Sequence, residues 1–592
     1  MTRSTTVPIT LLMAACATSD PVPLPAPVPV PVAIETADTA ALAGEPAAHA
    51  PGRVPPAGRY LPGFDALHYH IAIAVPERGT VIRAVATADI AIRAPVQATL
   101  RLDLTGLLVT RTTVQPRRGS VFADAAFRQD DGRVYVTLPA DVRAGETIRV
   151  SVEYSGSPDD GLIIRDNVHG RRGAFGDNWP DRARFWFPAI DHPSDKATAS
   201  YEVRAPRGWQ VIANGVRVDA AGNLLGTTTA ASAAPPADGI WRWRIDQPVP
   251  TYLMVIGATP FATASIDDCA AGGRAASRAS ECVPTGFWSF PEDSANAARI
   301  FRRAGDMLEY YSARIAPFPY ARLAHVQSAT RFGGMENAGA IFYSEQAIAR
   351  GTLGEGTVAH EIAHQWYGDA VTPARWADLW LSEGFATYFG ALYFEHADGV
   401  DRFREIVQGS WAGYLRSDVT DIAVVDTLST PGNDLLELLN ANSYNKGGAV
   451  LHMLRGVIGD SAFFNAMRAY YERHTPGNAT TADLRHVVEE AARRDLGWFF
   501  EQWLYRPGHP VFRVTHDWNA QTRTTTVVIE QVQKSAWPVF RVPMQVAIET
   551  AGGTVRRQVD LTQRRTELTF ELPAASTGVV VDPDGWVLKV VQ

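Results

Sequence analysis

The spacing of the hydrophobic positions changes twice along this chain of 592 residues. Between about residues 60 and 262, short apolar runs alternate with polar residues and end at Gly, Pro or Asp, which is typical of β-strands. From about residue 284 the apolar positions recur at helical spacing, as in Asn296 to Tyr311. Beyond Pro510 the alternation returns, as in Thr524 to Ile529. The pattern therefore predicts a β domain, a mainly helical domain and a second β domain.

The middle part contains both strand and helix signals. Two predicted strands, Leu323 to Ser328 and Ala340 to Tyr343, flank the segment Gly333 to Asn337. Helical periodicity then predicts one helix over Thr357 to Tyr367 and a second over Asp378 to Tyr393, with a proline in the break between them. Because the connection is short, we expect the two helices to pack antiparallel.

The first of these helices carries the spacing of a metal site, His360-Glu361-x-x-His364, and Glu383 lies on the second helix. Residues four apart stand on the same face of a helix, so both imidazoles can reach one metal ion. Two histidines and a carboxylate leave the fourth tetrahedral position to water, which is typical of catalytic zinc. Glu361 stays free to handle protons beside the metal. The alternative is a pair of packed core histidines, but the helical context favours one zinc ion per chain.

Composition narrows the possible functions. The chain is 46% hydrophobic and can fill several cores, and it has no apolar run of about eighteen residues that would indicate a membrane span. A net charge of −8 without a basic stripe argues against a nucleic-acid partner. Lysine occurs only at Lys196, Lys446, Lys534 and Lys589, so almost all positive charge is arginine.

The first 58 residues are not expected to form part of the fold. Residues 1–15 contain an arginine, a short apolar stretch and Met-Ala-Ala before Cys16, a pattern similar to a bacterial lipoprotein signal. Cys16 would then carry a lipid as the only membrane contact; the alternative is an ordinary signal peptide with an incidental cysteine. The alternating prolines of Pro21 to Val32 favour an extended tether within residues 16–58. The expected location is the periplasm or cell envelope.

The other two cysteines, Cys269 and Cys282, lie in a Gly/Ala/Ser-rich stretch thirteen residues apart. An exported chain makes a disulfide between them plausible, and closing so short a loop would stabilise the fold by up to ~3 kcal/mol. The alternative is two unpaired thiols. Neither cysteine is expected to bind the metal, since both are far in sequence from the zinc motif.

Four motifs in order give the chain a family resemblance. GGMEN (Gly333 to Asn337), HEIAHQW (His360 to Trp366), WADLWLSEGFATYF (Trp376 to Phe389) and YNKG (Tyr444 to Gly447) together resemble the aminopeptidase N family of zinc metallopeptidases, the gluzincins. The resemblance implies three folded domains: an N-terminal β saddle, a thermolysin-like α+β/helical catalytic domain and a C-terminal antiparallel β-sandwich. The expected boundaries are 1–15 for the signal peptide, 16–58 for the tether, 59–262 for the saddle, 263–508 for the catalytic domain and 509–592 for the sandwich.

The resemblance also implies a role for each motif. Glu361 would act as general base and then general acid, and the Tyr444 hydroxyl would stabilise the oxyanion beside zinc. Glu336 would hold the α-ammonium of the substrate, which limits cleavage to peptides with a free N-terminus. The glycines before it would let the substrate backbone pair along this segment. The residues expected to bind substrate are Gly333, Gly334, Met335, Glu336 and Asn337.

Two departures from the family pattern bear on function. Many members have a second acceptor for the α-ammonium five residues before the arginine that corresponds to Arg184, but this chain has Trp179 there, with Asp177 as the nearest candidate after a local shift. The chain is also expected to be a short form that lacks the large C-terminal helical domain, which predicts an open active site. Lys446 lies inside the tyrosine motif, and we assign it no role.

Three hypotheses follow for the function. The first is a zinc aminopeptidase that hydrolyses the N-terminal bond of peptides. The second, an enzyme of the same kind with relaxed or endopeptidase specificity, is suggested by Trp179. The third is a catalytically inactive surface binding protein with the same fold. The presence of Glu361, Tyr444 and all three metal ligands argues against the third.

Overall fold

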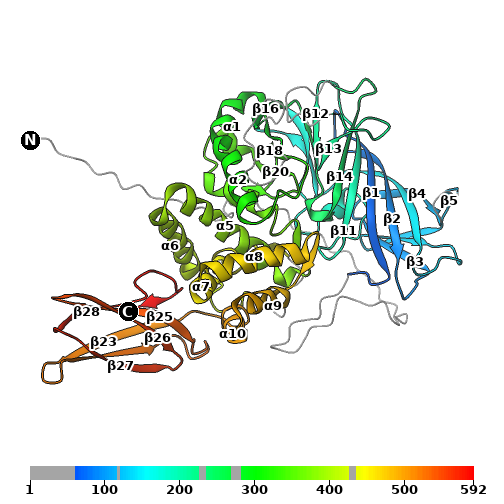
Figure 1. Ribbon diagram of the computed structural model, residues 1–592. Helices are drawn as coiled ribbons and strands as arrows, with labels where there is room; N and C mark the ends of the chain where they lie inside the picture. The colour runs from blue at the N-terminus through cyan, green and yellow to red at the C-terminus, as the bar shows by residue number, and fades with distance from the viewer. Residues whose placement is uncertain (1–59, 117–120, 226–234, 268–281, 426–434) are drawn as a thin grey trace, which may run out of the picture.

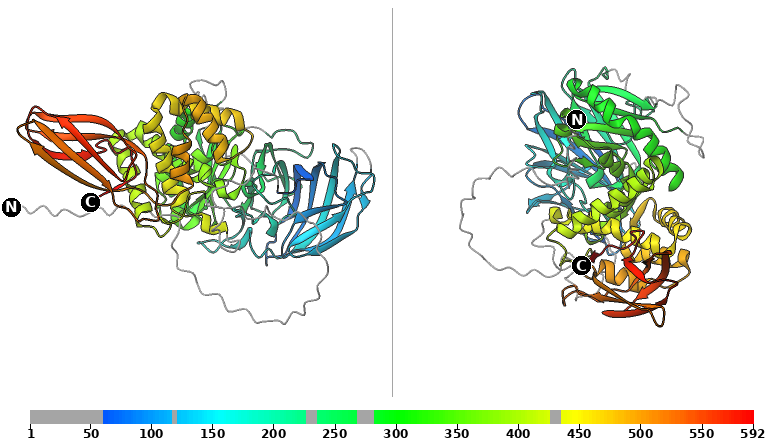
Figure 2. Two further views of the ribbon diagram at one scale, coloured as in Figure 1. Left: turned by 90° about the horizontal axis from the view of Figure 1, so that it is seen from below. Right: turned by 90° about the vertical axis from the view of Figure 1, so that its left-hand side faces the viewer.

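The chain forms three modules in a row, a β module, a mainly helical module and a second β module (Figures 1 and 2). The computed structural model describes residues 60–116, 121–225, 235–267, 282–425 and 435–592. The predicted signal peptide, the tether with Cys16, and Cys269 lie outside these residues. None of the helices described within those ranges is long and apolar enough to cross a bilayer.

The N-terminal module is built around an eight-stranded sheet in the order β13-β14-β11-β1-β2-β8-β4-β5. Along β1, buried residues such as Tyr69, Ile71 and Ile73 alternate with more exposed ones, so one sheet face covers a core and the other faces outward. Its strands are β1 (Phe64–Ala74), β2 (Ile82–Ile92), β4 (Leu108–Gln115), β5 (Ala123–Asp124), β8 (Thr147–Gly156), β11 (Lys196–Arg204), β13 (Val216–Arg217) and β14 (Ile240–Pro250).

Two smaller sheets complete this module. One has the order β12-β15-β10-β9 and the other β3-β7-β6. Their hydrophobic residues join those of the large sheet in one core, which also contains Met335 and Phe342 from the middle module. The strands are β3 (Thr99–Asp103), β6 (Phe127–Asp130), β7 (Arg133–Thr137), β9 (Leu162–Asp166), β10 (Arg172–Gly176), β12 (Gln210–Ala213) and β15 (Ile256–Thr259).

The middle module begins with a five-stranded sheet in the order β16-β17-β18-β20-β19. Strands β17, β18 and β20 run parallel, and β16 and β19 pair antiparallel at the two edges. The predicted strands over 323–328 and 340–343 are confirmed as β18 and β20. The bounds are β16 (Ala262–Asp267), β17 (Thr285–Ser289), β18 (Leu323–Ser328), β19 (Gly334–Met335) and β20 (Ala340–Ser344).

Ten α-helices are described for the middle module. A short parallel pair, β21 (Val371–Pro373) and β22 (Gly477–Ala479), lies among them. The helices are α1 (Ser294–Ile300), α2 (Ala304–Arg314), α3 (Glu345–Ala349), α4 (Glu355–His364), α5 (Trp380–Asp398), α6 (Val400–Arg416), α7 (Gly447–Ile458), α8 (Asp460–His474), α9 (Thr481–Ala492) and α10 (Gly497–Leu504).

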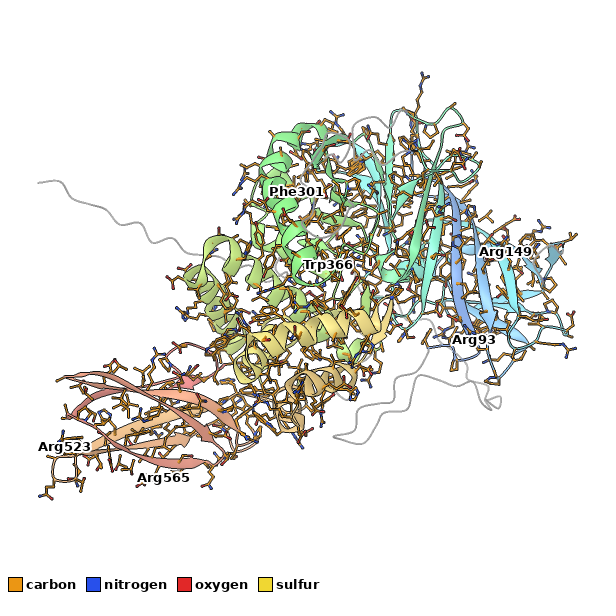
Figure 3. All side chains as sticks on the ribbon, in the orientation of Figure 1. Arg93, Arg149, Phe301, Trp366, Arg523 and Arg565 are labelled. Carbon is orange, nitrogen blue, oxygen red and sulfur yellow. The ribbon has the colours of Figure 1, made fainter. Side chains whose placement is uncertain are left out.

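The helical periodicity from Asn296 to Tyr311 is confirmed, but it belongs to two helices, α1 and α2. A 3-10 turn at Phe301–Arg303 separates α1 from α2. The turn places the ring of Phe301 against that of His325, with centroids 4.7 Å apart, and Phe301 is fully buried in the middle module, as is Trp366 (Figure 3). Tertiary packing thus outweighs the local helical pattern.

The C-terminal module consists of two sheets, in the orders β27-β24-β23-β29 and β26-β25-β28. The predicted antiparallel arrangement holds except for β29, which runs parallel to β23 because the last strand crosses back to the sheet edge. The strands are β23 (Val511–Asn519), β24 (Thr524–Gln531), β25 (Val542–Thr550), β26 (Gly553–Leu561), β27 (Arg565–Glu571), β28 (Ser576–Val581) and β29 (Val590–Val591).

Three of the four lysines connect modules. The Lys196 ammonium, on β11, donates to the carbonyls of Asp369, Ala370 and Gly477 at 2.9, 2.9 and 3.1 Å. These three bonds attach the N-terminal sheet to the segment that follows α4 and to β22. A guanidinium has a planar fork and cannot replace an ammonium that meets three carbonyls from different directions.

The joint between the middle and C-terminal modules depends on lysine as well. Lys446 is fully buried, and its Nζ lies 3.4 Å from the Arg506 carbonyl in the linker. On the surface, Lys534 of the C-terminal module pairs with Asp421 at 2.7 Å. The linker is thereby fixed to the turn that contains Tyr444.

His452 forms a second contact at this joint. Its ring, on α7, stacks on Trp586 of the C-terminal module with centroids 4.7 Å apart. Its Nε2 is 3.1 Å from the Gly585 carbonyl and its Nδ1 is 3.2 Å from the Tyr388 hydroxyl. A neutral ring satisfies both partners, with Nε2–H as donor and Nδ1 as acceptor.

The burial of His452 predicts a dependence of stability on pH. Burial lowers the pKa of His452 to about 4, so below pH 6.5 the unfolded chain binds a proton that the folded chain does not. Lowering the pH from 7 to 5 should therefore remove about 2 kcal/mol of unfolding free energy through this residue. Chemical denaturation at both pH values should show that this acidification lowers the unfolding free energy of His452→Phe less than that of the wild type. An equal loss in both proteins would contradict the assignment.

Candidate functional site

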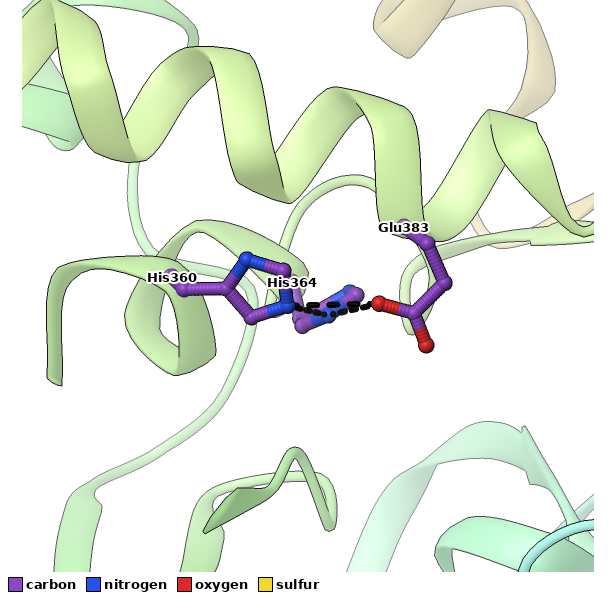
Figure 4. Close-up of side chains that lie close together, drawn as sticks. All are labelled: His360, His364 and Glu383. Carbon is purple, nitrogen blue, oxygen red and sulfur yellow. Dashed lines mark hydrogen bonds and ion pairs between the residues drawn. The ribbon is translucent and has the colours of Figure 1, made fainter. Parts of the chain in front are cut away.

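Helices α4 and α5 bring the three predicted metal ligands together, since His360 and His364 lie on α4 and Glu383 lies on α5. The Nε2 atoms of His360 and His364 are 3.0 Å apart, and each lies 3.2 Å from Oε2 of Glu383 (Figure 4). Ligand atoms about 2.0–2.1 Å from one tetrahedral zinc would be about 3.3 Å apart, so the three atoms suit one ion of this size. His364 and Glu383 are buried, and His360 alone is partly exposed. The donor set and its spacing fit zinc.

Neighbouring side chains fix the orientation of His364. Its Nδ1 lies 3.1 Å from the Ser382 hydroxyl and 3.3 Å from the Tyr367 carbonyl, which directs Nε2 toward His360 and Glu383. Such outer contacts hold a metal-binding histidine in one tautomer. The sequence motifs contain Ser382 directly before Glu383, but its role emerges only from the folded geometry.

Three carboxylates surround His364. Besides Glu383, one carboxylate oxygen each from Glu336 and Glu361 lies with a His364 nitrogen in a group whose members are within 4.8 Å of one another. Burial lowers the pKa of His364, but the charges of Glu383 and Glu336 outweigh it and raise the pKa to about 10. Burial and neighbouring carboxylates raise the pKa of Glu361 well above its usual range. A bound cation would favour the charged forms of these buried carboxylates.

Tyr444 lies beside His360. It belongs to a π-helical turn, Asn442–Lys446, and its ring stacks on the His360 imidazole with centroids 5.8 Å apart and planes 17° apart. Such turns occur frequently at functional sites. The turn reaches α5 closely because two glycines meet, and a Cβ on Gly384 would lie 2.8 Å from the Gly447 backbone. The structure therefore places Tyr444 beside the ligand set, as the resemblance implied.

The segment Gly333 to Asn337 lies against α4. Gly334 and Met335 form β19, which pairs with β20 on one side and is the edge of its sheet in the part of the chain that the structure describes. A Cβ on Gly334 would lie 2.3 Å from Oε1 of Glu361, so only glycine allows the strand to approach the predicted general base. An edge strand beside the metal ligands offers backbone groups to an extended peptide.

Glu336 follows directly after β19, and its side chain is only 5% exposed. Burial raises the pKa of Glu336 to about 7. Its backbone carbonyl accepts a hydrogen bond from Nε2 of Gln365 at 2.8 Å, while Oε1 of Gln365 accepts from the Gly339 amide. Gln365 thus holds the Glu336 segment to the end of α4. The sequence shows this glutamine next to His364, but its spacing alone indicates no role.

Neither candidate for a second ammonium acceptor is available to a substrate. Trp179 is 2% exposed and packs edge-on against Phe332 and Trp376. Asp177 is fully buried, and its two oxygens accept hydrogen bonds from Thr330 and from arginine side chains. These partners argue against the possibility that Asp177 fills the second acceptor position after a local shift.

The structure describes one of the two cysteines of the predicted disulfide. Cys282 is disulfide-bonded, whereas Cys269, its predicted partner, lies outside the described residues. Cys16, the predicted lipidation site, lies outside them as well.

The ligand set predicts that a divalent metal stabilises the folded protein. Zinc at a hundredfold excess over its dissociation constant should add about 2.7 kcal/mol to the unfolding free energy of metal-free protein. Thermal unfolding with and without zinc measures this effect. It should disappear in His364→Gln and persist in His486→Gln, whose exposed side chain lies on α9. A zinc effect that survives in His364→Gln would refute the site.

Comparison with known proteins agrees with this geometry. The chain is 28% identical to "Aminopeptidase N" of Streptomyces lividans over 371 residues, which span 60% of this chain and 40% of that protein. It is 28% identical to human "Glutamyl aminopeptidase" over 357 residues, which span 57% and 34% of the two chains. It is 23% identical to "Leucyl aminopeptidase" of Saccharolobus solfataricus over 515 residues, 83% and 59% of the two chains. The matched region thus spans less than two thirds of each relative.

The domain matches follow the modules seen in the structure. Residues 65–253 match the peptidase M1 N-terminal domain, and residues 301–503 match the peptidase family M1 domain. The second match contains all three ligands, Glu361 and Tyr444. Because the two matches together cover about two thirds of the 592 residues, the chain belongs to the peptidase M1 family, the aminopeptidase N family of metallopeptidases.

Proposed function

We propose that this protein is a zinc-dependent aminopeptidase that removes the N-terminal residue from peptides. The distance of Glu336 from the metal-binding group carries the proposal, because its carboxylate lies within 4.8 Å of Glu361 and His364. The α-nitrogen and carbonyl carbon of one residue are about 2.5 Å apart, whereas each further residue adds about 3.3–3.6 Å. Glu336 can therefore bind the ammonium of the residue whose carbonyl is attacked, but not one that lies further along the chain.

The residues around the metal can carry out hydrolysis of the first peptide bond. Bound zinc supplies a water of lowered pKa and polarises the substrate carbonyl. The Glu361 carboxylate accepts a proton from the attacking water and transfers it to the departing amine. The Tyr444 hydroxyl donates a hydrogen bond to the oxyanion that forms. The free edge of β19 holds the substrate backbone in register with these groups.

The relatives support this activity by name, since the three compared above are each called aminopeptidases. We also propose a thermolysin-like fold for the middle module, which the helix pair α4 and α5 with its two histidines and Glu383 supports. Relaxed specificity for the peptide N-terminus is the second candidate function. Only Glu336 is proposed to bind the ammonium, because Trp179 and Asp177 are buried away from the substrate.

Blocked and free substrates test the proposal. Zinc-loaded protein should cleave a free peptide and spare its N-acetylated form, and a chelator should stop the cleavage. Glu361→Gln should lower kcat by about 10²–10⁴-fold, the usual contribution of a general base. Glu336→Ala should lower kcat/KM by removing a buried charge partner, which costs about 2–5 kcal/mol.

Each alternative outcome has one interpretation. Equal cleavage of free and acetylated peptides would establish relaxed specificity. No cleavage of any peptide by zinc-loaded wild-type protein would contradict the proposal and favour the inactive binding protein.

The close approach of Gly334 to Glu361 gives an independent test. In Gly334→Ala the new methyl group would occupy the space of the Glu361 carboxylate, so activity should fall by about 10²-fold or more through displacement of the general base. Zinc binding should persist because none of the three ligands is displaced. Gly356→Ala is the matched control, since its Cβ, near the start of α4, meets nothing within 4 Å. Full activity in Gly334→Ala would contradict this geometry.

A further inference from the structure

A cluster of four charged side chains joins the N-terminal module to the segment that precedes Gly333. Asp160 and Asp177 face Arg182 of the same module and Arg331 of the middle module. Oδ2 of Asp177 accepts from Arg182 at 3.0 Å and from Arg331 at 3.1 Å, and Oδ1 of Asp160 accepts from both arginines at 2.7 and 2.5 Å. Two carboxylates therefore alternate with two guanidinium groups across the module boundary.

Neutral hydrogen bonds complete the cluster at Asp177. Its Oδ1 accepts from the Thr330 hydroxyl at 2.7 Å, and the Thr330 oxygen in turn is 3.3 Å from the Phe332 amide. Asp177 is fully buried and the Arg182 side chain is 6% exposed, so these charges are stable only with their partners in place. The geometry of residues 330–332 thus depends on Asp177.

The substrate-binding segment starts where this cluster ends. Arg331 lies two residues before Gly333, and β19 itself comprises only two residues with one neighbouring strand. At the other end, Gln365 holds the Glu336 carbonyl. A strand this short gains little from its own pairing, so its position must be fixed by its two ends. The charged cluster fixes the N-terminal end of β19.

We propose that Asp177 and Arg331 are positioning residues that hold β19 in the place from which Glu336 meets the substrate ammonium. Asp177 was the candidate for a second ammonium acceptor. Its contacts with Thr330 and Arg331 instead give it the role of holding the segment before β19. The kinetic consequence rests on the proposed aminopeptidase function, whereas the positioning itself does not.

Hydrogen exchange tests the positioning without any activity. In zinc-loaded Asp177→Asn and Arg331→Gln, the backbone amides of residues 333–337 should exchange about tenfold faster than in the wild type. The amides of α4 and of the core strand β18 should keep their protection. Asp89→Asn, which removes the ion pair with Arg149 on the N-terminal sheet, is the matched control and should leave residues 333–337 unchanged. Unchanged exchange in both cluster variants would overturn the proposal, as would a uniform loss across α4 and β18.

Kinetics then separate positioning from direct binding of the ammonium. Both variants should raise KM for a free peptide by about tenfold with a smaller effect on kcat, the loss expected of a hydrogen bond to a charged group. The double variant should be no worse than either single variant, because the two residues act as one unit. A decrease in KM for Arg331→Gln with an increase for Asp177→Asn would instead make Asp177 an ammonium acceptor and overturn the proposal.

The two proposals fail separately. If wild-type protein cleaves no peptide but the exchange of residues 333–337 rises in both cluster variants, the aminopeptidase function is wrong and the positioning stands. If cleavage of free peptides is normal and neither exchange nor KM changes in the variants, the function stands and the positioning is wrong.

Discussion

The close contact between strand β19 and helix α4 is the constraint on which the site depends. Gly334 has no side chain to keep the strand away from Glu361, and the Gln365 side chain donates to the carbonyl of Glu336, directly after the strand. As a result the carboxylate that we propose for the ammonium, Glu336, and the one that we propose for proton transfer, Glu361, lie within a few ångströms of the predicted metal ligand His364. A side chain at 334 would occupy the space of the Glu361 carboxylate and displace it, so this close contact needs glycine.

The site is assembled at a boundary between modules. The N-terminal module contributes Lys196, which binds the carbonyls after α4, and Asp177, which binds the loop before β19. On the other side, Lys446 fixes the π-helical turn to the linker at Arg506, and His452 fixes α7 to Gly585 of the C-terminal module. Both outer modules therefore help to position side chains of the middle module. The arrangement of the site thus depends on residues far from the metal motif.

The sequence predicts best what depends on local spacing. The separation of His360 and His364, and the helical pattern around them, identify the metal site, and strands β18 and β20 follow from their apolar runs. Contacts between segments that are far apart in the sequence leave no signal in the local spacing of hydrophobic residues. The partners of Asp177, the burial of Trp179, the break between α1 and α2 and the parallel pairing of β29 all arise when remote segments pack.

The most direct test of the account is a crystal structure of zinc-loaded Glu361→Gln with a short unblocked peptide, measured with anomalous scattering at the zinc edge. The account predicts a metal peak between His360, His364 and Glu383, and the peptide ammonium within hydrogen-bond distance of Glu336. A peptide that extends past Glu336 with residues on both sides of it, or a metal peak elsewhere, would contradict the central claim.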